Sequence, residues 1–262
     1  MSTTLPRSLL EIRYAEAAQE YLASLPLEHF MEATPQATQR EISVQSFALL
    51  RLRRPEVHYF NELLVQYSYG EEGEEGLVVP DNMIVLYDGP IRAEGSYAVE
   101  IQPVGPFLVL EYVSKSSTRK DYEVSFHKYE RELQVPYYLL FYPETQDLSL
   151  FHRGANQYVT VTPNDAGRLA IPELDLEVAI QEGWARYWYR GKLLELPADL
   201  QRAIDKMTER LRVAEETIRQ SDEKARRSDE KLRVADEKAR QSDEKIEQLR
   251  AQMRASGIEP NF

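Results

Sequence analysis

The sequence contains no cysteine among its 262 residues. Disulfide bonds, thiolate zinc sites and cysteine nucleophiles are therefore excluded, and a bound metal ion would need oxygen or imidazole ligands. A glycine-rich phosphate loop and a nucleophile elbow are also missing. The four histidines show no ligand spacing such as His-x-x-x-His, and no role is assigned to them: His29, His58, His127 and His152.

Long apolar runs are missing as well. No segment approaches the roughly 20 apolar residues that a bilayer-spanning helix needs, and the N-terminus lacks the charged-then-apolar pattern of a signal peptide. A composition of 42% hydrophobic and 29% charged residues fits a soluble protein with a sizeable core. We therefore expect a cytoplasmic protein without a membrane partner.

Positive charge is scarce outside the C-terminal part. The formal net charge is −12, yet residues 221–254 hold ten Lys/Arg and nine Asp/Glu, which leaves −13 on the rest of the chain. Non-specific DNA binding requires Lys and Arg to neutralise phosphates. The acidic body therefore counts against any function on nucleic acid.

One carboxylate interrupts an apolar segment. Residues 106–114 read Pro-Phe-Leu-Val-Leu-Glu-Tyr-Val-Ser, which predicts a central strand with Glu111 inside it. Because burying an unpaired carboxylate is costly, Glu111 should be paired, protonated, bound to a cation or placed at a strand end that opens onto a cleft. Glu111 is the best single candidate for chemistry.

Asp81 is the second candidate, because it follows Val79-Pro80 near the start of another predicted strand. If the two strands are neighbours, Asp81 and Glu111 could converge on Mg²⁺, which usually takes one or two carboxylates plus water. A helix that carries Lys128 follows directly. The alternative is structural: Asp81 would be a surface residue in a turn, and Glu111 would lie at a strand end.

Hydrophobic periodicity and turn residues predict a mixed order of helices and strands. In the first half of the chain we expect helices at 6–25 and 34–54 and strands at 57–67, 77–87 and 106–114. A helix at 120–133, capped within 116–118, should follow. After it we expect strands at 137–142, 148–153 and 157–162, and closing segments at 174–180 and 184–194. Residues 70–76 form a mobile acidic loop in this prediction. Thr38 could cap the second helix, whose apolar face would hold Ile42, Phe47, Leu49 and Leu50. The order indicates an α/β or α+β domain with a mixed sheet.

From about residue 198 the sequence predicts one long helix without glycine. Ser-Asp-Glu-Lys recurs at 221, 228 and 242, and Ala-Asp-Glu-Lys at 235, which is the seven-residue period of coiled coils. The two seam positions would hold Ile204, Leu211, Ile218, Ala225, Leu232, Ala239, Ile246 and Met253, and Met207, Ala214, Ser221, Ser228, Ala235, Ser242 and Leu249. Acids four residues before bases also support an isolated helix. A dimeric coiled coil and a long solvated helix both fit.

Several short motifs occur in a characteristic order. They are Val79-Pro80-Asp81, Leu-Val-Leu-Glu-Tyr-Val-Ser at 108–114, Ser-Thr-Arg-Lys-Asp at 117–121, Lys128-Tyr129, and Val-Pro-Tyr-Tyr-Leu at 135–139. Over residues 28–180 the chain resembles the Uma-type restriction endonucleases of the PD-(D/E)XK superfamily. The resemblance implies a restriction-endonuclease-like core, a mixed sheet flanked by helices, and Mg²⁺-dependent hydrolysis of DNA phosphodiester bonds.

The chain departs from the superfamily pattern at the lysine. The pattern has Lys two residues after the Glu, on the same face of the strand, and here Val113 stands at that position. Lys115 has the right parity but lies about 13 Å further along an extended strand. We assign the role to Lys128 instead, although many relatives carry their Lys where this chain has Ser125.

Two functions remain open at this stage. In the first, Asp81 and Glu111 bind Mg²⁺ and Lys128 stabilises charge during DNA cleavage. In the second, the fold has no catalytic activity and acts in protein interaction through its helical tail. The predicted organisation is an N-terminal helix at 1–27, a nuclease-like domain at 28–197 and a helical tail at 198–262, with a homodimer through the core or the tail as an option. The sequence leaves open DNA against RNA and any recognition sequence.

Overall fold

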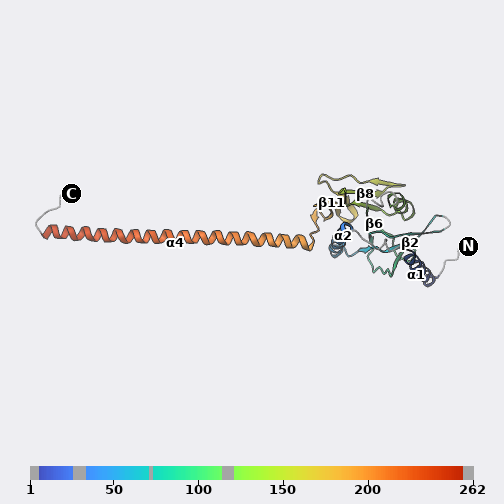
Figure 1. Ribbon diagram of the computed structural model, residues 1–262, viewed down its shortest axis with the longest axis horizontal. Coiled ribbons are helices and arrows are strands. Elements are labelled where there is room, and N and C mark those ends of the chain that lie inside the picture. The colour runs from blue at the N-terminus through green and yellow to red at the C-terminus, as the bar shows by residue number, and fades with distance from the viewer. Residues whose placement is uncertain (1–5, 26–33, 71–72, 114–120, 256–262) are drawn as a thin grey trace. The chain divides into compact units, whose positions relative to one another are not determined.

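The computed structural model describes residues 6–25, 34–70, 73–113 and 121–255. The chain divides into two compact units, Met1–Leu196 and Pro197–Phe262 (Figure 1). The first unit holds all the strands and two of the long helices, α1 (Arg7–Ser24) and α2 (Thr34–Arg53), and the second holds α4 (Pro197–Ala255). No described helix is long and apolar enough to cross a membrane. The domain boundaries expected from the sequence stay predictions.

The strands of the first unit form three sheets. A six-stranded sheet has the order β1 (Val57–Asn61), β4 (Asn82–Leu86), β6 (Leu108–Tyr112), β7 (Tyr137–Tyr142), β8 (Asp147–Arg153), β9 (Tyr158–Thr160). Its β6–β7 pair is parallel and its other pairs are antiparallel. A four-stranded sheet has the order β10 (Leu169–Ile171), β11 (Leu176–Gln181), β12 (Trp184–Tyr189), β13 (Lys192–Leu193). A three-stranded sheet has the order β3 (Glu74–Val78), β2 (Leu64–Tyr69), β5 (Ser96–Ala98). The predicted mixed α/β fold with a mixed sheet is confirmed.

The six-stranded sheet separates two apolar cores. Side chains alternate between its faces, so Leu108 and Leu110 of β6 belong to one core, and Val109 and Val113 to the other. The first core also contains Phe47 of α2 and the inner face of the β10–β13 sheet. Glu111 has the parity of Val109 and Val113, which fixes the face of the sheet on which its side chain lies.

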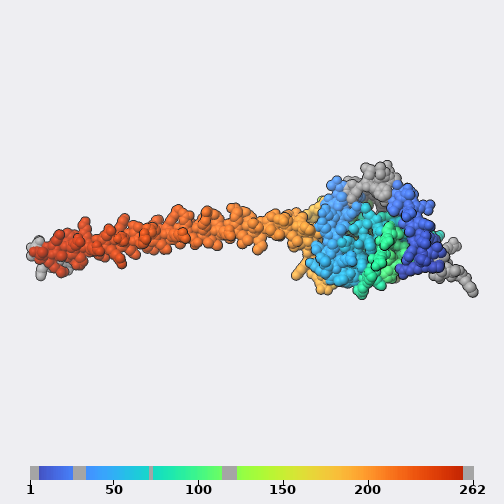
Figure 2. Space-filling view, turned by 90° about the horizontal axis from the view of Figure 1, so that it is seen from below, coloured from blue at the N-terminus to red at the C-terminus, as the bar shows by residue number. Residues whose placement is uncertain are grey.

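Helix α1 packs on the opposite side of the unit from the β10–β13 sheet, against β5. Figure 2 shows one face of this unit, where α1 in dark blue and α2 in lighter blue lie on either side of residues coloured cyan to green. The Tyr14 hydroxyl donates to Glu100 at 2.6 Å, and the Arg7 guanidinium donates to the carbonyl of Ile101 at 3.2 Å. Both bonds attach α1 to the segment that follows β5.

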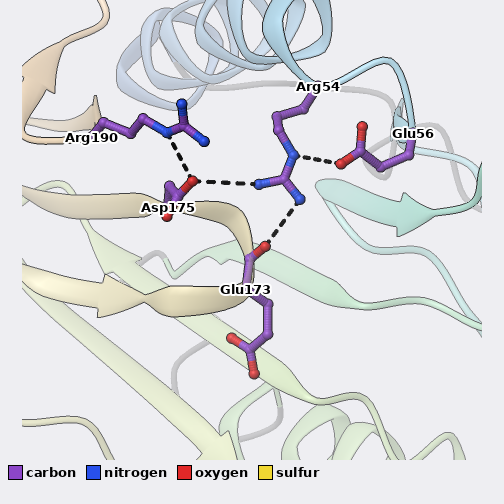
Figure 3. A network of polar contacts seen from close by, with 5 residues as sticks. All are labelled: Arg54, Glu56, Glu173, Asp175 and Arg190. Atoms are coloured by element: carbon purple, nitrogen blue, oxygen red, sulfur yellow. Dashed lines mark hydrogen bonds and ion pairs between the residues drawn. The ribbon is translucent and has the colours of Figure 1, made fainter.

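An arginine at the end of α2 joins the helix to the β10–β13 sheet (Figure 3). The Arg54 guanidinium donates from Nε to Glu56 at 2.5 Å and from Nη2 to the carbonyl of Glu173 at 3.1 Å, and its Nη1 lies 3.9 Å from Asp175. Arg190 pairs with the same Asp175 carboxylate at 2.9 Å. Since the Arg54 side chain is only 22% exposed, it is held more firmly than an ordinary surface ion pair.

The predicted strand at 57–67 is wrong in one respect. It is two strands, because Glu62 adopts a left-handed backbone with a φ of 47°, which ends β1 and redirects the chain into β2. The two strands then join different sheets. A non-glycine residue in this conformation leaves no signal in hydrophobic periodicity, so the break was not predictable from the alternation of side chains.

The predicted strand at 77–87 and the predicted loop at 70–76 are also corrected. Residues Glu74–Val78 form β3, so the last three residues of the expected loop are strand. The segment Val79-Pro80-Asp81 separates β3 from β4, and proline cannot donate to a strand ladder. This interruption matters for the site, because it places Asp81 at the entry of β4 and not inside a strand.

Helix α2 differs from its prediction in the expected Thr38 cap and in its buried face. It begins at Thr34, and the Thr38 hydroxyl lies inside the helix and donates to the carbonyl of Thr34 at 3.0 Å, so Thr38 is not its cap. Phe47 is buried as expected, whereas Ile42 and Leu49 are only partly buried. The fully buried residues of α2 include polar side chains: Gln39, Ser43, Ser46, Phe47 and Leu50.

The helix predicted at 120–133 is largely π-helical. Two π-helical turns, η2 (Asp121–Ser125) and η3 (Lys128–Glu132), flank a short α-helical link, and the amide of Leu133 donates to the carbonyl of Lys128 at 2.9 Å. The i→i+5 pairing of a π-helix changes which side chains face the sheet. The predicted caps at 116–118 lie outside the described residues.

Candidate active site

The structure brings Asp81 and Glu111 together across neighbouring strands. In the antiparallel β4–β6 pair, Asn82 lies opposite Leu110 and Met83 opposite Val109. Continuing this register by one residue places Asp81 opposite Glu111. The two acids, separated by thirty positions in the sequence, therefore meet at one end of β4 and near the end of β6.

Two hydrogen bonds from other residues hold the carboxyl pair. The backbone amide of Tyr112 donates to Asp81 Oδ2 at 2.6 Å. The Tyr129 hydroxyl donates to Glu111 Oε1 at 2.5 Å. Tyr129 is fully buried and belongs to the second core, so packing as well as hydrogen bonding determines where Glu111 lies.

Burial raises the pKa of both acids. Desolvation is the main cause at Asp81 and raises its pKa to about 6, although the Tyr112 amide and the charge of Arg40 oppose it. Desolvation and then the charge of Asp81 raise the pKa of Glu111 well above its usual range. The interaction between the two side chains lowers the pKa of Asp81 and raises that of Glu111, so Glu111 keeps the proton.

Asp81→Asn should be more stable than the parent at pH 8 in metal-free buffer and equally stable near pH 4. A carboxyl whose pKa is raised by folding favours the folded state fully below its unfolded pKa, and this contribution is lost as the pH rises through the folded value near 6. Since one pKa unit equals about 1.4 kcal/mol, the difference in the free energy of unfolding at pH 8 is about 3 kcal/mol. Thermal unfolding in EDTA from pH 4 to 8 measures it. Parallel curves for the two proteins would contradict the raised pKa.

Lys128 does not join the two acids. Its ammonium Nζ donates to the carbonyl of Leu77 in β3 at 2.8 Å, and no interaction with either carboxylate is seen in the described part of the chain. Val113, at the lysine position of the superfamily pattern, is 4% exposed and packs in the second core. Ser125 ends η2, and the further candidates Lys115 and Lys120 lie outside the described residues.

A basic residue of α2 lies close to the pair and was not predicted from the sequence. The Arg40 guanidinium is paired with Glu62, the residue at the break between β1 and β2. The charge of Arg40 lowers the pKa of Asp81, and that of Glu62 raises it. The sequence feature that could have indicated Arg40 is a polar set on α2, Gln39, Arg40 and Ser43, whose helical spacing matches that of a buried face.

A buried polar network lies beside the acids. Asn82, the residue after Asp81, donates to Asn61 at 2.5 Å and accepts from the Tyr112 hydroxyl. On α2, Ser43 is hydrogen-bonded to Tyr187 at 3.0 Å. Because buried polar groups that are fully paired restrict side-chain rotation, this network holds the β4 and β6 ends in a fixed relation.

Residues 27–185 match the Uma2 family, which is described as "Putative restriction endonuclease". The chain belongs to the Uma2 family. This match confirms the resemblance based on the short motifs, and it includes Asp81, Glu111 and Lys128. The site described above therefore lies within the Uma2 part of the chain.

The other comparisons add little to the Uma2 match. The curated proteins contain no match. Among solved structures, the chain is similar to "a putative nuclease belonging to DUF820 from Anabaena variabilis ATCC 29413", with 16% identity, a TM-score of 0.41, and coverage of 55% of this chain and 75% of that one. At this TM-score the similarity supports no conclusion about the site.

The donor set of this Uma2 chain fits a hard divalent cation. Two carboxyl groups in contact, with raised pKa values, lose their mutual repulsion when a cation lies between them. Within the described ranges no group of three or more His, Asp or Glu side chains could hold a metal ion. A site with two carboxylates matches Mg²⁺, which completes its octahedral shell with water and substrate phosphates and does not need a protein cage.

Proposed function

We propose that this Uma2-family chain is a Mg²⁺-dependent endonuclease that hydrolyses DNA phosphodiester bonds, with Asp81 and Glu111 as the metal ligands. The observation that supports it most is the contact between these two acids, which converge from separate strands with raised pKa values. Perturbed carboxyl pairs are typical of functional sites. The family description, which names a restriction endonuclease, supports DNA as the substrate class.

Each residue of the site has a distinct task in this proposal. Asp81 and Glu111 would hold Mg²⁺, which when bound supplies positive charge to the scissile phosphate and favours ionisation of water. Tyr129 orients Glu111 through its 2.5 Å hydrogen bond, and the Tyr112 amide orients Asp81. Arg40 favours the ionised form of Asp81, which is the form that binds a cation.

A nicking assay tests the activity directly. Supercoiled plasmid incubated with the full-length chain and Mg²⁺ should be converted to the open-circular or linear form, and EDTA should prevent the conversion. Single-stranded DNA and RNA of matched length, assayed in parallel, define the substrate class. Absence of cleavage of every nucleic acid at each divalent cation tried would reject the nuclease proposal.

Lys128→Ala should abolish DNA cleavage but keep the stabilisation by Mg²⁺, if Lys128 is the catalytic lysine. The ammonium now donates to the carbonyl of Leu77, and a flexible four-carbon chain can exchange that partner for a phosphate. Cleavage rates and Mg²⁺ melting shifts of the parent, Lys128→Ala and Lys128→Arg measure the effect. A fully active Lys128→Ala would reject this assignment, and Lys115, Lys120 and Arg40 would be the next candidates.

The second candidate function is a catalytically inactive member of the family that acts in protein interaction. It is favoured by Val113, which is buried where the superfamily pattern has its lysine, and by the net charge of −13 outside residues 221–254. A scaffold gains nothing from two repelling acids in contact, and for this reason we rank it second. It predicts neither a Mg²⁺ melting shift nor cleavage.

A further inference from the structure

Helix α4 is a long helix without a core of its own. It runs through 59 residues without a break, and none of its residues is buried in the described chain. Its exposed apolar side chains are Leu200, Ile204, Met207, Leu211, Val213, Ile218, Leu232, Val234, Ile246, Leu249 and Met253. Since most helices in proteins owe their stability to packing of an apolar face, a further surface is expected to cover this one.

Most of these apolar side chains lie on one seam. Written as heptads abcdefg with Ile204 at position a, the large residues at a and d are concentrated toward both ends of the helix, and alanine and serine fill most of the middle around Leu232. Val213 and Val234 lie at c, outside the seam. An a/d seam of this kind fits another helix with the same distribution, because large residues then meet large residues at both ends.

Charges beside the seam are sorted by sign. In four consecutive heptads position e is aspartate and position g is lysine: Asp222, Asp229, Asp236 and Asp243 at e, and Lys224, Lys231, Lys238 and Lys245 at g. One flank of the seam is therefore acidic and the other basic. The acidic f positions and basic b positions alternate on the opposite side of the helix.

The aspartates at e and the lysines at g have no ion-pair partner within the described part of the helix. The ion pairs along the repeat region join outer positions, as in Glu209–Arg212, Glu216–Arg219 and Glu230–Arg233. None of the four e aspartates or four g lysines forms an ion pair among the described residues. These are the side chains that interhelical pairs in coiled coils use.

We propose that α4 pairs with α4 of a second copy of this chain as a parallel, in-register coiled coil. In a parallel pair, position g of one helix faces the following e of the other, so Lys224 meets Asp229 of the partner subunit and Lys231 meets Asp236 of the partner subunit. In an antiparallel pair e faces e and g faces g, so aspartates would meet aspartates and lysines would meet lysines. The sorted charges therefore specify both a copy of this chain as the partner and the direction.

The parallel arrangement also brings together two charged g-to-e pairs outside the four regular heptads. Arg210 meets Glu215 of the partner subunit, which adds an attractive pair. Lys245 meets Arg250 of the partner subunit, which is the one like-charged pair, and it lies beside the large seam residues Ile246 and Leu249. A slip by one heptad keeps the charge pattern but places Ile218 and Leu232 opposite alanines, so these two large inner seam residues select the in-register form.

Parallel pairing has a functional consequence that rests on the proposed function. The N-terminal ends of both α4 helices meet, and each is preceded in its chain by one nuclease unit. Two active sites attached at the same end of a dimer suit cleavage of both strands of one duplex. The tests below read out association alone, so they can fail or succeed independently of nuclease activity.

A set of charge reversals tests the pairing. The full-length variant with Lys224→Asp, Lys231→Asp and Lys238→Asp has acids on both flanks, and its dimer affinity should fall by at least about a hundredfold, because three pairs and their symmetry mates change from attraction to repulsion. Adding Asp229→Lys, Asp236→Lys and Asp243→Lys to it exchanges the two flanks and should restore the dimer. Sedimentation or light scattering at several concentrations and two salt concentrations measures both. A monomeric parent, or a reversal without effect, would overturn the proposal.

Single cysteines test the direction, since the chain has none of its own. In a parallel pair Met207→Cys and Leu249→Cys, both at d, should each form a disulfide-linked homodimer in a glutathione redox buffer. In an antiparallel pair d faces a of the other helix, so neither variant should link to itself, and Met207→Cys should link only when it is mixed with Ile246→Cys. Glu216→Cys at the outer f position is the control and should not link. Mixed links would reject the parallel arrangement.

Discussion

Asp81→Asn and Glu111→Gln are each expected to abolish phosphodiester cleavage and to leave the first unit folded. Both variants remove an anionic ligand that Mg²⁺ requires while keeping the size of the side chain. The loss of rate should exceed the 10–100-fold that replacement of an outer-shell partner typically causes. Folding should not suffer, because each substitution also removes one of two repelling charges.

The same variants should lose the thermal stabilisation by Mg²⁺. For the parent, binding to the folded state adds about 2.7 kcal/mol when free Mg²⁺ is a hundred times its dissociation constant, which is measurable as a melting shift. Asp88→Asn is the matched control, because it removes the same charge from an exposed turn of the same unit. It should keep both the shift and the cleavage. A Mg²⁺ shift that persists in Asp81→Asn and Glu111→Gln would place the metal elsewhere.

The two acids could be found from the sequence because each one breaks a local rule. Glu111 is a charge in an apolar strand, and Asp81 follows a proline at a strand entry, so both are conspicuous without any knowledge of tertiary structure. Their convergence was a conditional expectation, since strand order is a long-range property. The β4–β6 register supplies the missing step.

The surroundings of the acids were much harder to predict. Tyr129 has the composition and spacing of a core residue, which it is, and its hydrogen bond to Glu111 depends on how η3 packs. The π-helical turns shift the side chains of this segment relative to an α-helical prediction, and the Lys128 ammonium in η3 donates to the carbonyl of Leu77. Arg40 comes from α2, and only the three-dimensional fold brings that helix to the site.

The break at Glu62 illustrates a different limit. Alternation of apolar side chains reports which face of a strand is buried, and it carries no information on whether the strand stays in one sheet. A single left-handed residue moves β2 into another sheet, and the same residue then pairs with Arg40 next to the site. One backbone angle thus determines both the sheet organisation and a charge close to Asp81.

Truncation after Pro197 is expected to convert the dimer to a single copy in solution and to leave the first unit folded with an almost unchanged melting temperature. No residue of α4 is buried, and both apolar cores are built from residues before 197, so removal of the helix takes nothing from either core. Because 1 kcal/mol corresponds to about 2–4 °C for a unit of this size, a change below about 2 °C is expected.

The truncated chain also separates the two roles assigned to this protein. Light scattering should give one copy for the truncated chain and two for the parent, and the triple Lys→Asp reversal at 224, 231 and 238 is the control that keeps α4 but removes its pairing. If the two sites act on the two strands of a duplex, both variants should nick plasmid at the parental rate per site yet convert nicked plasmid to the linear form more slowly. Because the variants differ in whether α4 is present, an equal defect in both assigns the effect to association. A defect in the truncated chain alone would instead assign α4 a direct role in the nuclease unit.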